Sequence, residues 1–524
     1  MHCSQRREFR TLRAPRTSIA TMSNLYAALG AALRDQATAI VLESGERTWT
    51  GAQLDAWVAR YAGALRDLGL QPGDRIAVQV EKSAANIALY FAALRIGAIY
   101  VPLNTAYQPR EIEYFLSDAA PRVFVVAPER VDTLHAIATA TGVQHLVSLG
   151  TREDGSLADR AASAPSFDNI IERGPRDLAV ICYTSGTTGR SKGAMISHDN
   201  LLSNARTLVV LWGFTPRDVL LHALPLYHIH GLFVALHIAV LAGARIVLQA
   251  RFDAKVALTT LRRATTMMGV PTFYTRLLAE PSLSKDVVAN VRLFISGSAP
   301  LLAETFAEFE SRTGHRILER YGMTETQMIA SNPLEGERRP GTVGPPLPGV
   351  SVRITNEHGD SLPRGEIGNV EVAGPNVFQG YWRMPEKTAQ EFRSDGYFVT
   401  GDLGTIEADG YVRLVGRAKD LIISGGLNVY PKEIEELIDA IPGVEESAVF
   451  AIPHPDFGEA VGAAVTLKKG STVTEANIAD VLRPQLASFK LPKRIFVMDE
   501  LPRNAMSKVQ KALLRDRYAS TFKG

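Results

Sequence analysis

The 524-residue chain has few cysteines, no long apolar run and almost no net charge. Its two cysteines, Cys3 and Cys182, can form neither a disulfide framework nor a cysteine-based metal site. No run of about 18 apolar residues occurs, which argues against a transmembrane helix. Because the formal net charge is only +2, we expect neither a nucleic acid nor a membrane as a partner. The composition is typical of a globular protein from a reducing compartment, so we expect a cytoplasmic location.

Residues 1–21 differ in composition from the rest of the chain. They contain five arginines and a single acid, together with several Ser and Thr, a pattern typical of a transit peptide that would direct the protein to mitochondria. The alternative is a start codon placed ahead of the true one, because Met22 opens directly into a helical pattern. Both interpretations stay open, and the segment is excluded from the predicted fold.

Short apolar runs alternate with amphipathic helical patterns, which predicts an α/β protein. Residues 25–127 have βαβ rhythm, including a strand-like piece at 48–50 and a helix over 51–68, and predict an open, largely parallel sheet. A second alternating block covers residues 199–295. From Val350 onward the strands are short and broken by Gly, Pro and Asp, which favours a small β-rich subdomain. We expect all three within one N-terminal domain, residues 22–416.

The last hundred residues have their own alternation of helices and strands. Helices are predicted over 431–440 and 475–486, and strands over 447–452, 460–467 and 494–498. This pattern indicates a small α+β domain, residues 420–524, that is large enough to move as one body. Residues 417–419 would then be a hinge, with Lys419 at its centre.

The stretch from Tyr183 to Gly193 reads Tyr-Thr-Ser-Gly-Thr-Thr-Gly-Arg-Ser-Lys-Gly and lies between two short apolar runs. Its glycines let backbone N–H groups approach a ligand, and its hydroxyls and Lys192 provide donors for phosphate oxygens. The Gly-x-x-x-x-Gly-Lys-[Ser/Thr] spacing of a Walker A motif is absent. An exposed linker is the alternative, but a linker needs no buried strands on both sides. The stretch therefore predicts an anion-binding loop.

This loop resembles the phosphate-binding signature of the acyl-adenylate-forming superfamily, which includes acyl-CoA synthetases, peptide-synthetase adenylation domains and luciferases. Further motifs of that superfamily follow in its order: Ser296–Pro300, Glu319–Thr326, Thr400-Gly401-Asp402, Gly416–Asp420, Gly425–Pro431 and Pro502–Lys508. The resemblance implies ATP, Mg²⁺ and coenzyme A. It also implies two steps, in which a carboxylate and ATP give an acyl-adenylate and pyrophosphate, and a thiol then displaces AMP.

The resemblance also assigns roles to single residues. It places the ATP phosphates on Thr184, Ser185, Gly186, Thr187, Thr188, Gly189 and Lys192. The rest of the nucleotide falls to Ser298, Glu319, Tyr321, Thr324, Asp402 and Arg417, with Asp402 on the ribose hydroxyls. Mg²⁺ falls to Glu325, with Thr187 as a weaker candidate, and the pantetheine arm of CoA to Gly425 and Gly426. The catalytic set is Lys508, Thr324, Glu325 and His230.

Lys508 carries the most specific of these expectations. It would bridge the attacking carboxylate and the α-phosphate, because a compact cation offsets the repulsion between two anions. The preceding residue departs from the superfamily, which usually has glycine where this chain has Ser507. If that position needs a positive φ, the serine adds strain and slows adenylation.

Three mainly apolar segments, residues 225–231, 269–276 and 296–300, are expected to form the acyl pocket. His230, Arg276 and Ser298 would contact the substrate, and Arg276 would pair with a second carboxylate. A salt bridge on a helix surface is the alternative for Arg276. These segments and the run Gly380–Lys387 look more like malonyl-CoA synthetases than long-chain or aryl ligases.

The predicted substrate is therefore a dicarboxylic acid, malonate or methylmalonate. Another short acid stays possible, as does an adenylation enzyme that loads a carrier protein. The latter is disfavoured because no carrier segment follows Lys508. A nucleotide-binding pseudoenzyme is suggested only by Ser507.

Overall fold

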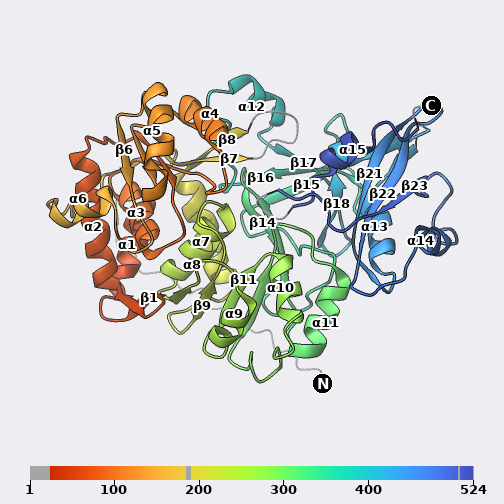
Figure 1. Cartoon of the computed structure of the whole chain (residues 1–524), viewed down its shortest axis with the longest axis horizontal. Coiled ribbons are helices and arrows are strands. Elements are labelled where there is room, and N and C mark those ends of the chain that lie inside the picture. Colours follow the sequence, from red (N-terminus) through yellow and green to blue (C-terminus); the bar gives the residue numbers. More distant parts are fainter. Residues whose placement is uncertain (1–23, 185–190, 426, 505–507, 523–524) are drawn as a thin grey trace, which may run out of the picture.

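The computed structural model describes residues 24–184, 191–425, 427–504 and 508–522. Within these ranges the chain forms two large α/β sheets, a small antiparallel sheet and a separate C-terminal sheet. Figure 1 shows the C-terminal unit on the right, with the small sheet between it and the α/β body. The predicted fold class is confirmed: two α/β subdomains, a β-rich subdomain and a small C-terminal domain.

The first large sheet has the strand order β6-β5-β3-β4-β7-β8. Its strands are β3 (Arg75–Gln79), β4 (Ile99–Pro102), β5 (Val123–Val126), β6 (His145–Ser148), β7 (Leu178–Thr184) and β8 (Lys192–Ser197). All neighbours are parallel except β7 and β8. The Gly-rich stretch thus connects two antiparallel strands at the edge of this sheet.

The second large sheet has the order β14-β13-β12-β11-β9-β10-β1-β2. Its strands are β1 (Ile40–Ser44), β2 (Arg47–Thr50), β9 (Val219–His222), β10 (Arg245–Leu248), β11 (Thr266–Gly269), β12 (Leu293–Ser296), β13 (Leu318–Met323) and β14 (Gln327–Ser331). The expectation that the strand at 48–50 belongs to the first sheet is wrong. It pairs with β1, and β1 pairs with β10 in the register Leu42 to Ile246. The hydrophobic periodicity of a segment predicts a strand, but it does not predict which strand, far away in the sequence, will pair with it.

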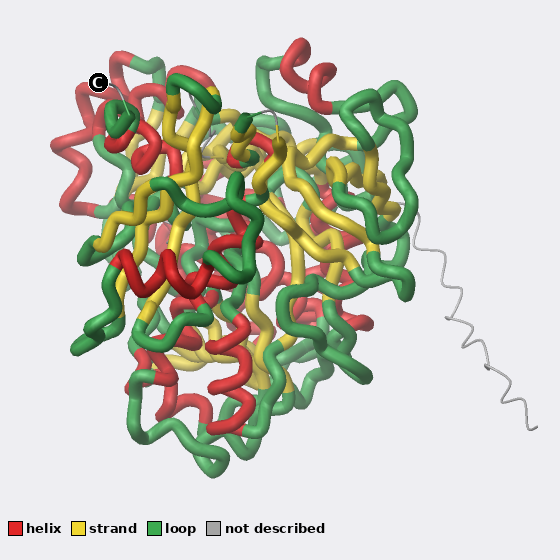
Figure 2. The backbone as a smooth tube through the Cα atoms, turned by 90° about the vertical axis from the view of Figure 1, so that its right-hand side faces the viewer, coloured by secondary structure: helices red, strands yellow, loops and turns green. Residues whose placement is uncertain are grey.

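The remaining strands are shorter or antiparallel. The small sheet consists of β15 (Ser351–Thr355), β16 (Gly368–Ala373), β17 (Phe398–Ile406) and β18 (Val412–Arg417). The C-terminal sheet consists of β19 (Ile422–Ser424), β20 (Leu427–Val429), β21 (Val444–His454), β22 (Gly458–Leu467) and β23 (Arg494–Val497). Figure 2 turns the C-terminal side of the molecule toward the viewer.

Helices cover the sheets. In the α/β body they are α1 (Leu25–Asp35), α2 (Gly51–Asp67), α3 (Ala84–Arg95), α4 (Pro109–Ala119), η1 (Pro128–Arg130), α5 (Val131–Ala140), α6 (Ser156–Ser163), α7 (His198–Leu211), η2 (His230–Ala235), α8 (Leu236–Leu241), α9 (Ala254–Leu261), α10 (Pro271–Leu278) and α11 (Ala303–Thr313). Further along the chain are α12 (Pro385–Glu391), η3 (Ala418–Asp420), α13 (Pro431–Asp439), α14 (Glu475–Leu482) and α15 (Lys511–Tyr518). Among the described residues, no helix combines the length and apolar character needed to cross a membrane.

One hydrophobic core joins the two large sheets. It contains inward residues of both sheets together with α1, α2, α3 and α8, and α3 is buried along its whole length. Close packing of this kind resists local rearrangement. The loops at the strand ends are therefore held on a rigid body, which is the usual support for a binding site.

Side-chain capping explains where β8 ends and α7 begins, next to the predicted anion-binding loop. The Ser197 side chain accepts a hydrogen bond from the backbone N–H of Asn200, and the Asn200 side chain accepts from Ser197 N–H. This capping box ends β8 and starts α7 at one residue. Lys192 lies five residues before Ser197 on β8, so the same strand fixes its position.

Candidate active site

Three strands of two different sheets bring Tyr321, Asp402 and Arg417 together. The Tyr321 hydroxyl donates to Asp402 Oδ2, and Arg417 Nε lies 2.8 Å from Asp402 Oδ1. Burial is the largest cause that raises the pKa of Tyr321, followed by Asp402. Both carboxylate oxygens have a partner, and each retains a lone pair for a further donor. The arrangement suits the two ribose hydroxyls expected at Asp402.

Glu325 follows in the turn between β13 and β14 and is buried. The Tyr381 hydroxyl donates to its Oε1 at 3.1 Å, and burial raises the pKa of the carboxyl. No group of three or more His, Cys, Asp or Glu side chains that could hold a metal ion occurs among the described residues. Mg²⁺ is commonly bound by one or two carboxylates together with phosphate oxygens and water. A single buried carboxylate beside the nucleotide residues fits that ion.

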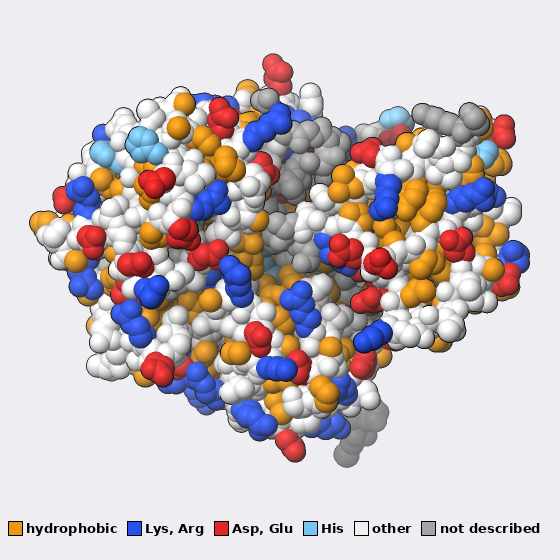
Figure 3. All heavy atoms as spheres, in the orientation of Figure 1, with side chains coloured by type: hydrophobic (Ala, Val, Ile, Leu, Met, Phe, Trp, Pro, Cys, Tyr) orange, Lys and Arg blue, Asp and Glu red, His pale blue; other side chains and the backbone are white. Residues whose placement is uncertain are grey.

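Lys508 reaches the same place from the C-terminal unit. Desolvation is the main cause that lowers the pKa of its ammonium, followed by Arg417, while Asp402 and Glu325 act in the opposite direction. The Asn504 N–H donates to the Lys508 carbonyl oxygen at 2.9 Å, and the Lys508 N–H donates to Asn504 Oδ1 at 3.0 Å. Figure 3 shows the surface hollowed between the α/β body and the C-terminal lobe. Lys508 is exposed overall, and its ammonium lies within electrostatic range of Arg417, Asp402 and Glu325.

Arg320, on β13, is a buried cation. It is 4% exposed, and its Nε and Nη2 are buried without a hydrogen-bond partner among the described residues. The guanidinium lies against Gly297, where an added Cβ would come within 2.5 Å of Arg320 Cζ. Burial lowers the pKa of Arg320 to about 9, which leaves it charged at neutral pH. An unpaired buried charge is costly, so this site is suited to an anionic ligand.

Two histidines lie around Arg320. Burial lowers the pKa of His228 to about 3, with Lys508 and Arg320 as the next causes. Burial also lowers the pKa of His230, followed by Arg320. His230 Nδ1 lies 3.3 Å from Ser298 Oγ, and its Nε2 is buried without a partner in the described chain. Both imidazoles are neutral and can donate an N–H without adding charge.

The backbone around these groups is unusual. Ser298 has a φ of +73°, a left-handed conformation that serine adopts infrequently. Residues His230–Ala235 form a π-helix that continues directly into α8. Strained residues and π-helical turns both occur often at functional sites.

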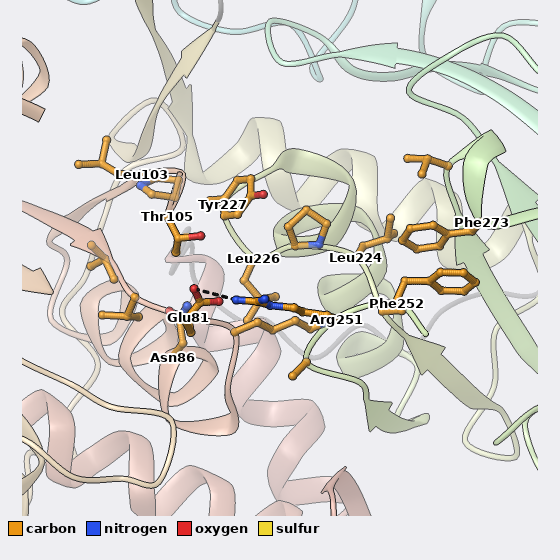
Figure 4. A pocket seen from close by; sticks show the side chains of 18 of the residues that line it. Glu81, Asn86, Leu103, Thr105, Leu224, Leu226, Tyr227, Arg251, Phe252 and Phe273 are labelled. Atoms are coloured by element: carbon orange, nitrogen blue, oxygen red, sulfur yellow. Dashed lines mark hydrogen bonds and ion pairs between the residues drawn. The ribbon is translucent and has the colours of Figure 1, made fainter. Parts of the chain in front are cut away.

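A cavity of about 410 Å³ lies next to this group, at the seam between the two large sheets (Figure 4). Its lining includes Pro225, Leu226, Tyr227, Val270, Phe273 and Arg276, which belong to two of the three segments expected to form the acyl pocket. Phe252 and Phe273 stack with their ring centroids 3.9 Å apart. Residues 296–300 are not among those that line this cavity; Gly297 lies against Arg320, and Ser298 Oγ lies 3.3 Å from His230 Nδ1.

Arg276 lies on α10 at the wall of this cavity. A cation that selects a second carboxylate by being buried should be largely inaccessible, but Arg276 is exposed. No described residue forms an ion pair with it, so the alternative of a helix-surface salt bridge is also not observed. The physical reason is its position, because the buried face of α10 is formed by Tyr274, Leu277 and Leu278.

The other predicted residues are placed as follows. Thr184 ends β7, and its hydroxyl lies 3.5 Å from the Lys192 carbonyl oxygen. Glu319 is buried with its Oε1 unpartnered among the described residues, and burial raises its pKa to about 7. Thr324 is half-buried in the turn beside Glu325. Gly425 has a φ of +59°, and its N–H donates to the Phe457 carbonyl within the C-terminal unit. Predictions for Ser185, Gly186, Thr187, Thr188, Gly189, Gly426 and Ser507 fall outside the described residues.

Two members of the site were not assigned by sequence reasoning, although both lie in motifs that it singled out. Arg320 follows Glu319 directly, and His228 lies two residues before His230. The signal for Arg320 was a charged residue inside an apolar strand, with Ile317, Leu318 and Tyr321 around it. A buried cation at such a position needs a reason.

A model of the AMP-binding enzyme family matches residues 30–382, and a model of the AMP-binding enzyme C-terminal domain matches residues 433–508. The chain belongs to the AMP-binding enzyme family. A crystal structure of ATP-bound MatB from Rhodopseudomonas palustris is 54% identical, with a TM-score of 0.94 over 96% of this chain and 100% of that chain.

Among sequence relatives, the mitochondrial malonate–CoA ligase ACSF3 of Bos taurus is 36% identical over 85% of this chain and 82% of the relative. A feruloyl-CoA synthase of Amycolatopsis is 34% identical over 92% of this chain and 96% of the relative. As a member of this family, the protein is an AMP-forming acid–CoA ligase that uses ATP, Mg²⁺ and CoA. The relatives named here act on different acids, so the family alone leaves the acid open.

Proposed function

We propose that the enzyme converts malonate, or methylmalonate, with ATP and CoA into the acyl-CoA, AMP and pyrophosphate through an acyl-adenylate. Buried, unpaired Arg320 is the observation that carries this proposal. A monocarboxylic acid would leave that charge without an anion, whereas a malonate-type acid brings one. The malonate–CoA ligase among the relatives supports the same acid.

The proposed orientation follows from the positions of two cations. Arg320 is among the charges that lower the pKa of Lys508, and we infer that one short diacid spans the two cations. Its reacting carboxylate would face Lys508 and the α-phosphate, and its distal carboxylate would accept from the free Arg320 nitrogens. Neutral His230 would donate a further hydrogen bond from Nε2 while its Nδ1 accepts from the Ser298 hydroxyl. A bidentate guanidinium–carboxylate pair fixes the direction of the acid as well as its charge.

The remaining residues are proposed to hold the nucleotide and the metal. Asp402 would accept from the ribose, Tyr321 would lie beside the adenine, and Lys192 would contact the phosphates. Glu325 would hold Mg²⁺, which neutralises phosphate charge when bound. These residues need only position groups and balance charge, because phosphoryl and adenylyl transfer requires little else from the protein.

We expect Arg276 to contribute less to the choice of acid than Arg320. Replacing it with methionine removes an exposed cation, and exposed charges contribute about 0.2–1 kcal/mol, which corresponds to at most about five-fold in kcat/KM. Steady-state kinetics of Arg276→Met with malonate checks this value. A hundred-fold or larger loss of kcat/KM would mean that Arg276, and not Arg320, makes the main contact with the substrate.

The domain boundary leads to a second expectation, that the C-terminal unit rotates about Lys419 between the two steps. Lys419 is exposed within η3, and its carbonyl accepts a hydrogen bond from Arg515 of α15 at 3.2 Å. Proline there fixes φ and should stiffen the pivot. Lys419→Pro is expected to retain pyrophosphate release while CoA-ester formation falls at least ten-fold. Lys419→Ala is the control. A proline variant with normal rates in both steps would contradict a hinge at Lys419.

The overall proposal is tested by measuring pyrophosphate release from ATP over a panel of acids, with and without CoA. We expect malonate or methylmalonate to give the highest rate, with the acyl-CoA as product when CoA is present. Stimulation by a carrier protein instead of CoA would favour an adenylation module. No release with any acid would favour a nucleotide-binding protein without activity.

A further inference from the structure

Lys192, the expected phosphate contact, already has an anionic partner. Its ammonium lies 3.0 Å from Glu391 Oε1 at the end of α12, and each of these side chains is 20% exposed. The same ammonium lies 4.0 Å from the centre of the Tyr381 ring. Tyr381 is held next to β8 by a β-bridge with Ala194. The Lys192 ammonium therefore already has an ion pair with Glu391 and a cation–π contact with Tyr381.

Glu391 is well fixed for this contact. Lys387, one helical turn earlier, lies 3.1 Å from its Oε1, and the Tyr381 hydroxyl donates to its Oε2 at 2.6 Å. Partial burial is the largest single effect on the pKa of Glu391 and raises that pKa. The hydrogen bonds from Tyr381, Lys192 and Lys387 act in the opposite direction, and together they lower the pKa below its ordinary value. The carboxylate is thus held in its charged form.

The same hydroxyl connects Glu391 to the expected metal ligand. Tyr381 also donates to Glu325 Oε1, at 3.1 Å, although a tyrosine has only one hydroxyl hydrogen to share. Two carboxylates therefore lie on either side of one donor, close to where the ATP phosphates are expected. A polyphosphate that approaches Lys192 must either displace Glu391 or lie beside its negative charge, and like charges at short range repel.

We propose that Glu391 is an internal substitute for phosphate: it binds Lys192 when no polyphosphate is present, and ATP and pyrophosphate bind by exchange against it. The exchange weakens the binding of pyrophosphate and so favours its release after adenylation. The inference rests on the acid–CoA ligase activity and on Lys192 as a phosphate contact, and it is independent of which acid is used.

The test is calorimetric titration of the full-length protein with inorganic pyrophosphate, with Mg²⁺ and with EDTA. Glu391→Gln retains the shape of the side chain and removes its charge. Because a competing ion pair of this exposure contributes on the order of 1 kcal/mol, we expect Glu391→Gln to bind pyrophosphate about three- to ten-fold more tightly in both conditions. Unchanged or weaker binding overturns the proposal. Weaker binding only with Mg²⁺ would show that Glu391 is a metal ligand instead.

Two controls make the result specific. Glu386→Gln removes the same charge from the exposed side of α12 and should leave the affinity unchanged. In a Lys192→Met background, Glu391→Gln should give no gain, because the group released by the exchange is absent. If the Gln variant folds poorly by thermal unfolding, Glu391→Asp, which withdraws the charge by one methylene, should give part of the gain. A gain that persists without Lys192 contradicts the exchange.

Discussion

Replacing Arg320 with methionine is expected to lower kcat/KM for malonate by about thirty-fold to several thousand-fold. A charge-assisted contact to a desolvated carboxylate is worth on the order of 2–5 kcal/mol when one partner is truncated. Butyrate and acetoacetate, which lack the distal charge, should gain relative to malonate because they no longer leave a buried cation unpaired. Steady-state kinetics with the three acids measures both effects.

The same variant separates binding from stability. Arg320 is buried without a partner among the described residues, so an apolar side chain of similar length should not destabilise the fold. We expect the apparent Tm of Arg320→Met to equal or exceed that of the wild type. Arg320→Lys, which keeps the charge but loses the planar fork, should retain part of the malonate activity. A variant with full malonate activity, or one that loses all acids equally, contradicts the proposed contact.

Lys508→Ala is the second change with a large expected effect. Arg417, Asp402 and Glu325 act electrostatically on its ammonium, and in the proposed role its charge is needed only while carboxylate and α-phosphate meet. Removal of one such stabilising group typically costs about 100- to 1,000-fold in rate. We therefore expect pyrophosphate release to fall by that factor. Thioester formation from supplied acyl-adenylate and CoA should stay within a few-fold of the wild type.

The two half-reactions are measured separately, by pyrophosphate release and by CoA-ester formation from the adenylate. Lys469→Ala removes a charge from an exposed position of the same domain and is the matched control. It should change neither step. Equal loss of both half-reactions in Lys508→Ala would mean that the residue supports the domain arrangement rather than adenylation alone.

Much of the architecture follows from local sequence patterns. The helix predicted over 51–68 is α2, Gly51–Asp67, and Gly69 after it has a positive φ of +75°. Such boundaries are set by capping and by residues adjacent in the chain. The pairing of β1 with β10 depends instead on a contact across about two hundred residues, and no local pattern contains that information.

The site shows the same division. Motif wording indicates Lys508, Asp402 and Glu325, whose mutual approach the structure describes. It does not distinguish Arg320 from Arg276, because both are arginines within mainly apolar segments. Burial separates them: β13 places Arg320 inside the body beside Gly297, whereas Arg276 is exposed at the wall of the cavity. The pairing of Lys192 with Glu391 likewise joins residues 199 positions apart.

The central claim is that the enzyme selects a second carboxylate. The most direct measurement is the ratio of kcat/KM for malonate to that for acetoacetate, which has nearly the same shape with a neutral methyl ketone in place of the distal carboxylate. With the wild-type enzyme at saturating ATP, Mg²⁺ and CoA, we predict a ratio of at least about thirty. A ratio near one, or a preference for acetoacetate, would contradict the claim.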